Sequence, residues 1–187
     1  MLVQSPVNYI SKINLKKRIS RRNIKEFLPD DVDFRVELAL AYQDIGYESA
    51  ICGKSYQFYE YASFLIEDND STARYRLHIG ETVTIITEDE NQNFAILRSI
   101  FSHQRNDQRF AFIIVDWFET TNQTKLECPV YKLQRTTRFR QIFPITKINT
   151  NRTAHFIHCC KDDGCIGGNH DIENNLYIRN LYFFTVI

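Results

Sequence analysis

The sequence predicts a mainly β domain with a helical N-terminal extension. Two runs rich in Phe, Ile and Val, Phe94–Phe101 and Arg109–Phe118, flank a connector with no apolar residue, which is typical of an antiparallel hairpin. Aromatic residues, which strands favour, are also concentrated between residues 56 and 66. Before these strands, residues 34–45 carry apolar side chains at helical spacing.

The predicted extension comprises residues 1–50, and the predicted β domain comprises residues 51–187. Up to residue 28 the chain has seven basic residues and one acidic residue. This basic segment is interpreted as a nuclear-import signal or a phosphate contact, or alternatively as a solvated tail. Ser20 can cap a short helix that Pro29 ends. Three Asp residues then favour the start of the second helix, which Gly46 ends.

Strands and turns alternate through the β domain. Trp117, the only Trp in the chain, comes where the second strand of the central hairpin is expected to reach a rim of the sheet. A polar loop is expected from Thr120 to Lys125, after this strand. The other predicted strands, in order, lie at 56–66, around 75–79, at 83–86, at 129–133, within 142–148 and at 176–187.

Composition excludes several classes of protein. The net charge is zero, so no global field draws the chain to nucleic acid or to a membrane. The sequence has no run of about 18 apolar residues, so no membrane-spanning helix is expected. Five cysteines, an odd number, and an N-terminus without the apolar core of a signal peptide predict an intracellular, reducing setting.

Three short motifs resemble the bromo-adjacent homology (BAH) family. They are Gly80–Val83, Phe94–Leu97 and Val115–Phe118, and their spacings agree with that family over roughly residues 56–187. Glu81 replaces the usual Asp, and Glu119 follows the Trp-Phe pair where the family often has an aromatic residue. The resemblance implies a BAH-like distorted β-barrel with an N-terminal helical extension. It also implies a non-enzymatic chromatin module that resides in the nucleus.

The resemblance also implies a binding site. In members that bind methylated lysine on histone tails, aromatic residues that match Phe94 and Trp117 help to form a cage. A quaternary ammonium held against such rings gains about 0.5–2 kcal/mol per favourable contact. Glu119 stands where a further aromatic residue is usual, and its carboxylate could pair with a methylated ammonium. The alternative is that both rings are buried in the barrel.

The C-terminal quarter contains the densest set of soft metal ligands. Cys160, Cys165 and His170 follow each other at x4 spacing, and His158 or His155 precedes them. Thiolates and imidazoles in this number suit tetrahedral zinc. The spacing matches no standard zinc knuckle, so a loop with part-buried thiols remains the alternative.

Two functions from different classes follow. The leading hypothesis is a chromatin-associated module that binds a histone tail, a nucleosome or a chromatin protein. The alternative is a nucleic-acid-binding domain of mobile-element origin that uses the basic N-terminus with Arg135, Arg138 and Arg140. No enzyme is predicted, because neither the carboxylates near the hairpin nor Cys160 with His170 form a defined catalytic pair.

Overall fold

The structure, a computed structural model, describes residues 9–19, 31–47, 56–68, 71–87, 92–136, 140–150, 154–160 and 175–182. Its elements are β1 (Tyr9–Ile19), α1 (Asp31–Gln43), β2 (Tyr56–Asp68), β3 (Ser71–His78), β4 (Thr82–Ile86), β5 (Gln92–Arg105), β6 (Gln108–Lys125), β7 (Cys128–Leu133), β8 (Gln141–Pro144), a 3₁₀ turn (Ile145–Lys147), β9 (Phe156–His158) and β10 (Leu176–Arg179).

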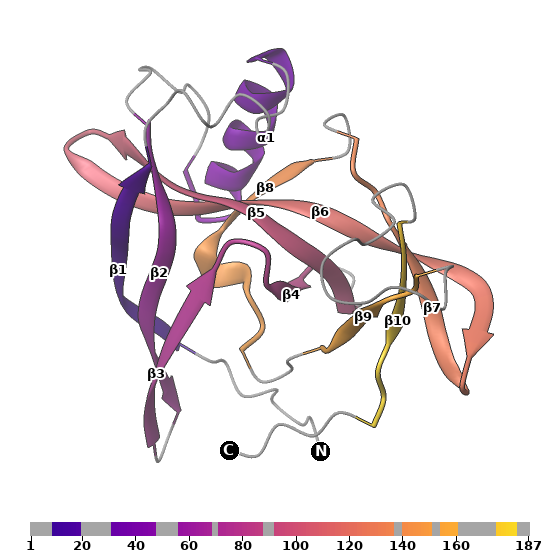
Figure 1. The fold of residues 1–187 in the computed structure, drawn as a ribbon. Coiled ribbons are helices and arrows are strands. Elements are labelled where there is room, and N and C mark those ends of the chain that lie inside the picture. Colours follow the sequence, from indigo (N-terminus) through magenta and orange to yellow (C-terminus); the bar gives the residue numbers. More distant parts are fainter. Residues whose placement is uncertain are drawn as a thin grey trace, which may run out of the picture.

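The described strands form one antiparallel sheet, so the predicted mainly β class is confirmed (Figure 1). The strand order is β1-β2-β5-β6-β7-β10-β9, with β3 beside β2, β4 beside β5 and β8 beside β6. This path does not return to its first strand, so a closed barrel is not formed by the described residues. Within the same residues, no helix is long and apolar enough to span a membrane.

The central hairpin consists of β5 and β6, as predicted. Their register runs from Ala95 opposite Trp117 to Arg105 opposite Gln108. The two-residue turn between the strands has positive φ at both positions, 46° and 61°, as the tight turns that suit twisted hairpins require. A β-bulge at Arg98 interrupts the register between Leu97 and Ser99.

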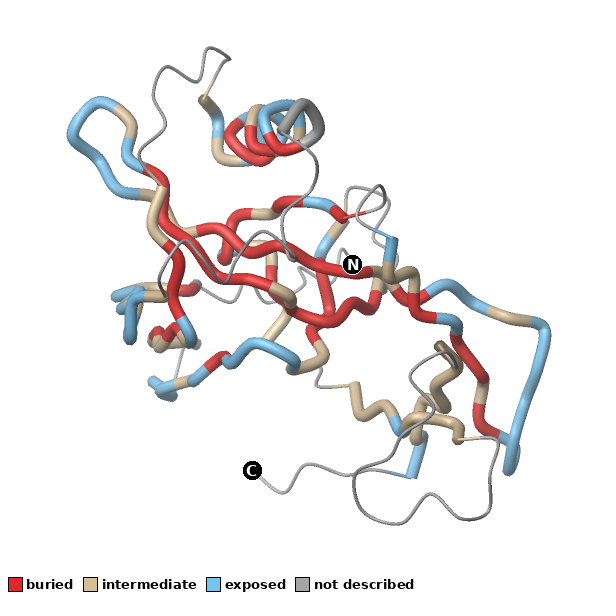
Figure 2. Tube along the Cα trace, turned by 45° about the horizontal axis from the view of Figure 1, so that its top comes forward, coloured by how far each residue is buried: buried red, intermediate tan, exposed pale blue. Residues whose placement is uncertain are grey.

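Side chains of β6 alternate between two apolar layers, which cover opposite faces of the hairpin. In Figure 2 the coil of α1 lies on one side of the buried central strands, which are drawn in red. Ile113 and Val115 are fully buried in one layer, which β1 to β4 and the 3₁₀ turn complete. Phe112 and Ile114 are fully buried in the other layer, against α1. The near-continuous apolar run in β6 follows from burial on both faces.

Helix α1 confirms the helix predicted at 34–45. Its buried face includes Phe34, Leu38 and Tyr42, which pack in the same cluster as Phe101 and Phe112. The helix is followed by Gly46, whose φ of 80° suits glycine at a helix end. Apolar spacing therefore predicted both the helix and the face that it buries.

A buried hydrogen bond fixes α1 on the sheet. The Tyr42 hydroxyl lies 2.7 Å from His103 Nδ1, and both residues are fully buried. Burial is the main cause that raises the pKa of Tyr42 to about 12, and Tyr47 adds to the effect while Arg105 opposes it. The phenol therefore stays neutral in its buried position near neutral pH.

The N-terminal region differs from the predicted helical extension. Its basic residues 12–18 lie on β1, which pairs with β2 from Tyr9 opposite Glu67 to Ile19 opposite Phe58. Backbone pairing along most of the strand, with Ile10 buried in the sheet core, outweighs its polar composition. The short helix expected after Ser20 lies outside the described residues, and the division at residue 50 stays a prediction.

Two further strand predictions differ from the structure. Strand β6 continues through Thr120–Lys125, where a polar loop was expected, because Thr124 and Lys125 pair with Pro129 and Cys128 of β7. Backbone hydrogen bonds of this hairpin do not depend on apolar side chains. The predicted last strand is shorter: β10 is part-buried and ends at Arg179, and residues 183–187 lie outside the described residues.

Candidate binding site around Trp117

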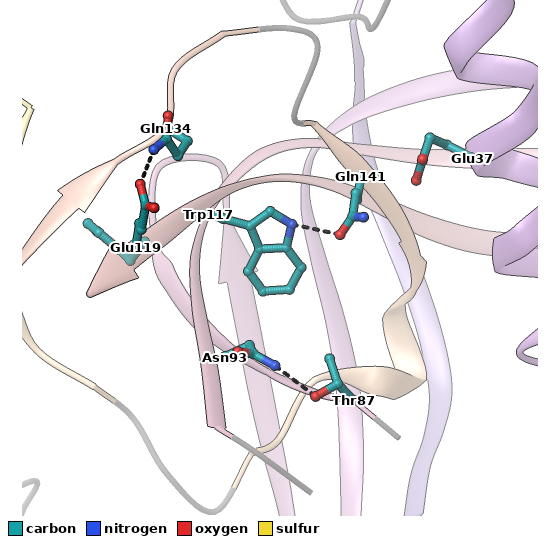
Figure 3. Close-up of a pocket in the computed structure, with 8 residues that line it drawn as sticks. Glu37, Thr87, Asn93, Trp117, Glu119, Gln134 and Gln141 are labelled. Atoms are coloured by element: carbon teal, nitrogen blue, oxygen red, sulfur yellow. Dashed lines mark hydrogen bonds between the residues drawn. The ribbon is translucent and has the colours of Figure 1, made fainter. Parts of the chain in front are cut away.

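Trp117 lies at a fork in the sheet. Along one edge of β6, pairing with β8 ends at Val115 opposite Gln141, and pairing with β7 begins at Phe118 opposite Leu133. The two partner strands diverge there and leave a hollow of about 590 Å³ (Figure 3). The backbone carbonyl of Trp117 is hydrogen-bonded at the fork, because the backbone N–H of Gln134 donates to it at 2.9 Å.

The indole of Trp117 is partly buried and held in one orientation. Its Nε1–H donates to Gln141 Oε1 at 2.7 Å, and its ring meets the Phe143 ring edge-on at 5.6 Å and 85°. In Figure 3 the indole stands in the middle of the hollow, between Glu119 with Gln134 and Gln141 with Glu37. An oriented ring can present a π-surface to a ligand without first losing side-chain entropy.

The rim of the hollow is acidic and rich in amides. Glu37 comes from α1 and Glu119 from β6, and none of the lining residues that the structure describes is Lys or Arg. The Ile142 N–H donates to Glu37 Oε2 at 3.4 Å, and Gln134 Nε2 donates to Glu119 Oε2. On the opposite side of the hollow, Asn93 donates to Thr87 at 2.7 Å. One indole with two carboxylates and neutral amides favours a cationic ligand.

Phe94 does not belong to this hollow. Ala95 is directly opposite Trp117, so Phe94 points to the other face of the hairpin. There it is 4% exposed and packs against Tyr131 and Phe156. The guanidinium of Arg179 lies over its ring at 4.4 Å, so this ring already contacts a cation of the chain itself. A cage that joins Phe94 to Trp117 is therefore incompatible with the register of β5 and β6, whereas Glu119 does share the hollow.

Asp116, the acidic neighbour of Trp117 in the sequence, forms ion pairs within the fold. Asp116 is fully buried, and its two carboxylate oxygens accept from Arg98 Nε at 2.5 Å and from Arg140 Nε at 2.8 Å. The bulge at Arg98 lets this side chain reach Asp116. Asp116, Arg98 and Arg140 therefore form a structural ion-pair group, although the sequence had suggested Arg140 for nucleic-acid binding.

The proposed metal ligands are only partly described. His158 Nδ1 and Cys160 Sγ lie 3.1 Å apart, so the structure brings two predicted ligands together. Cys165 and His170 lie outside the described residues, and the described residues contain no group of three or more possible ligands. The zinc site stays a prediction.

Two of the three arginines predicted to bind nucleic acid form contacts within the fold. Arg140 is 8% exposed and paired with Asp116, and Arg135 Nη2 donates to the Tyr177 hydroxyl at 3.2 Å. Arg138 lies outside the described residues. The two described arginines therefore do not present one shared phosphate-binding surface.

Five lining residues of the Trp117 hollow had no signal in the sequence. Each is a common polar residue, and they come from α1, β5, β8 and two segments between strands; they are Glu37, Thr87, Asn93, Gln134 and Gln141. The divergence of β7 and β8 from β6, together with the positions of α1 and of the β4–β5 pair, brings them together. A prediction of that fork would have been needed to find them.

No known family, curated protein or solved structure was found to match this chain.

Proposed function

We propose that the chain is a nuclear, non-enzymatic binding module of BAH-like type that docks on a histone tail or another chromatin protein. The proposal includes a distorted β-barrel related to that family. The hollow beside Trp117 is the proposed contact, and it takes a cationic side chain of the partner. The observation that carries the proposal is the combination of one oriented indole and two carboxylates, with no basic residue among the described lining residues.

The chemistry of the hollow favours a lysine of low methylation state. A single ring supplies only part of the π-surface of a full cage, so a trimethylated ammonium gains less here than in a site with several rings. A mono- or dimethylated ammonium still has an N–H, which can donate a hydrogen bond to Glu119 or Glu37. The two carboxylates therefore compensate for the missing aromatic residue, and unmethylated lysine is the competing ligand.

A peptide-binding assay tests the proposal. Fluorescence anisotropy with histone-tail peptides, unmodified or carrying one, two or three methyl groups, should find a peptide that binds the full chain with preference for the lower methylation states. Trp117→Ala should weaken that binding at least tenfold, which corresponds to about 1.4 kcal/mol. The variant should stay folded, because Trp117 is only partly buried.

A matched control shows whether a loss of peptide affinity is specific to removal of the aromatic ring at the hollow. Tyr182 is 64% exposed and lies outside the hollow, so Tyr182→Ala should leave peptide affinity unchanged. Equal affinity of the wild type and Trp117→Ala for every peptide that binds, with circular dichroism showing both folded, would exclude the hollow as the contact. Failure of all the peptides to bind would contradict the proposed class of partner.

A further inference from the structure

A second hollow, of about 560 Å³, lies between β1 and the β5–β6 hairpin. Its lining includes Lys16, Lys17 and Arg18 of β1 and Arg109 of β6, and the described lining includes no Asp or Glu. The four basic residues are exposed at their positions on these strands. The hollow is therefore basic, in contrast to the acidic rim around Trp117.

The fold brings these charges together from distant parts of the chain. Arg18 lies opposite Tyr59 on β2, and Tyr59 lies opposite Ile100 on β5, so the three strands are consecutive in the sheet. Arg109 follows on β6, opposite Gln104. Tyr59 is 5% exposed, and its hydroxyl lies 3.3 Å from Ser102 Oγ, so it contributes an ordered side chain to the hollow.

Most of the positive charge of this hollow has no ion-pair partner in the part of the chain that the structure describes. Among the described residues, Lys16, Arg18 and Arg109 form no salt bridge. Lys17 Nζ lies 3.2 Å from Glu60 Oε2, but both side chains are more than half exposed, so water screens this pair. An anion of higher charge can therefore compete for Lys17.

The backbone at Lys17 is unusual as well. Its φ is 54°, in the left-handed region that residues other than glycine adopt only at a cost. A second left-handed residue, Lys12, lies at the β-bulge between Ser11 and Asn14 of the same strand. These irregularities change the direction of side chains along β1, and strained positions of this kind concentrate at functional sites.

We propose that this basic hollow binds the phosphate groups of a nucleic-acid strand. Lysines on an edge strand also discourage pairing with other sheets, and β1 is such a strand. That role does not account for Arg109, which a different hairpin contributes to the same hollow. Four cations spread over two elements fit a polymer of phosphates better than a single small anion. The site shares no lining residue with the Trp117 hollow, so it does not rest on the proposed function.

Salt-dependent binding of oligonucleotides by the full chain tests the proposal. Labelled single-stranded DNA, RNA and duplex DNA are titrated at several salt concentrations, and the wild type is compared with the double variant Arg18→Ala/Arg109→Ala. We expect at least a tenfold loss of affinity for the bound form of nucleic acid. We also expect the slope of log affinity against log salt to fall by about 1.4–1.8, since each lost phosphate contact contributes about 0.7–0.9.

The double variant Arg74→Ala/Arg76→Ala is the matched control. Both arginines are exposed on β3, outside the hollow, and their loss changes the net charge by the same amount. The control should keep the affinity of the wild type. An equal loss in the two double variants would mean that only total charge matters, and it would overturn the proposal.

Two further measurements test for misfolding of the alanine variant and for a site that binds only small anions. Arg18→Lys/Arg109→Lys keeps the charges and should retain most of the affinity, so it identifies any loss in the alanine variant that comes from misfolding. Tripolyphosphate tests for a small-anion site: binding of this ion without measurable binding of any oligonucleotide would overturn the proposal. Peptide affinity at the Trp117 hollow should be the same in all these variants, so failure here is distinguishable from failure of the proposed function.

Discussion

Trp117 and Phe94 occupy neighbouring positions on the central hairpin but have different surroundings. Trp117 faces a hollow with polar side chains, and its indole is partly buried. Phe94 faces the opposite way, into a closed cluster in which the rings of Phe118 and Phe156 stack at 4.1 Å and 5°. Arg179 covers the Phe94 ring. The side of the strand therefore decides whether an aromatic residue is available to a ligand.

The comparison also shows how a cation–π contact can have opposite roles. Over Phe94 the cation belongs to the chain and adds to the stability of the fold. At Trp117 the charged residues of the described lining are carboxylates, which favour a cationic ligand. Aromatic composition alone cannot separate these roles, because both rings come from the same strand pair.

The closed cluster should show the largest effect on stability. Phe94→Ala removes a buried ring and leaves a cavity, so we expect a loss of about 3–5 kcal/mol in the free energy of unfolding. Trp117→Ala should cost less, about 1–2 kcal/mol, because part of its surface already contacts water. Urea unfolding of both variants measures the difference. Equal losses would mean that the indole is a core residue and would remove the contrast between the two faces.

Removal of zinc should lower the stability of the closed cluster around Phe94 and leave the Trp117 hollow unchanged. His158 contacts the Tyr177 ring at 5.0 Å, and Tyr177 contacts Phe118, so a zinc ion held by His158 and Cys160 would stabilise this cluster. Protein purified without chelator should then carry about one equivalent of zinc, and zinc at a hundred times its Kd should add about 2.7 kcal/mol of stability. Peptide affinity at Trp117 should not change. Metal analysis that finds no zinc, or the same zinc content in Cys160→Ser, would contradict this site.

The attachment of α1, which carries Glu37 to the open hollow, should be sensitive to high pH. Tyr42→Phe removes the hydrogen bond to His103, at an expected cost of about 1–3 kcal/mol. In the wild type the folded-state pKa of Tyr42 is about 12, against an ordinary value of 10.0. Above pH 10 the unfolded chain loses this proton while the folded chain keeps it, so stability falls as pH rises toward 12.

The phenylalanine variant should lack this part of the alkaline loss, while other tyrosines ionise in both proteins. Urea midpoints measured from pH 8 to about 12 check the prediction. Parallel curves for the two proteins would show that Tyr42 does not titrate as its burial implies.

Much of the fold was predictable because its signals are local. The apolar runs at Phe94–Phe101 and Arg109–Phe118 predicted the central pair, and the structure confirms their antiparallel register. Helical spacing predicted α1 and its buried face. The continuation of β6 through Lys125 was missed because backbone pairing with β7 stabilises a strand whose side chains are polar.

The site was less predictable because it depends on the side of a strand and on long-range register. Trp117 and Glu119 are two positions apart on β6, so they point to the same side and share the hollow, although the family resemblance was the reason for grouping them. Phe94 was assigned to them through the family resemblance. The Arg98 bulge and the pairing of Ala95 with Trp117 set its true direction, and neither follows from composition. The basic residues of β1 were interpreted as an import signal, a phosphate contact or a solvated tail, because their pairing with β2 is a long-range contact that their composition does not show.

The smallest effect should come from the carboxylates at the rim of the hollow. Glu119 is exposed, and exposed ion pairs contribute about 0.2–1 kcal/mol, so Glu119→Gln should weaken peptide binding only about two- to fivefold. The loss should be larger for a monomethylated lysine, whose N–H groups donate hydrogen bonds to the carboxylate, than for a trimethylated one, which has no N–H.

Glu127→Gln, at the exposed turn of the β6–β7 hairpin, is the matched control and should have no effect. Anisotropy titrations at low salt measure both variants, since salt screens exposed charges. If Glu119→Gln lowered affinity equally for every methylation state, the carboxylate would act only through its field. Selection among lysines would then depend on the Trp117 ring.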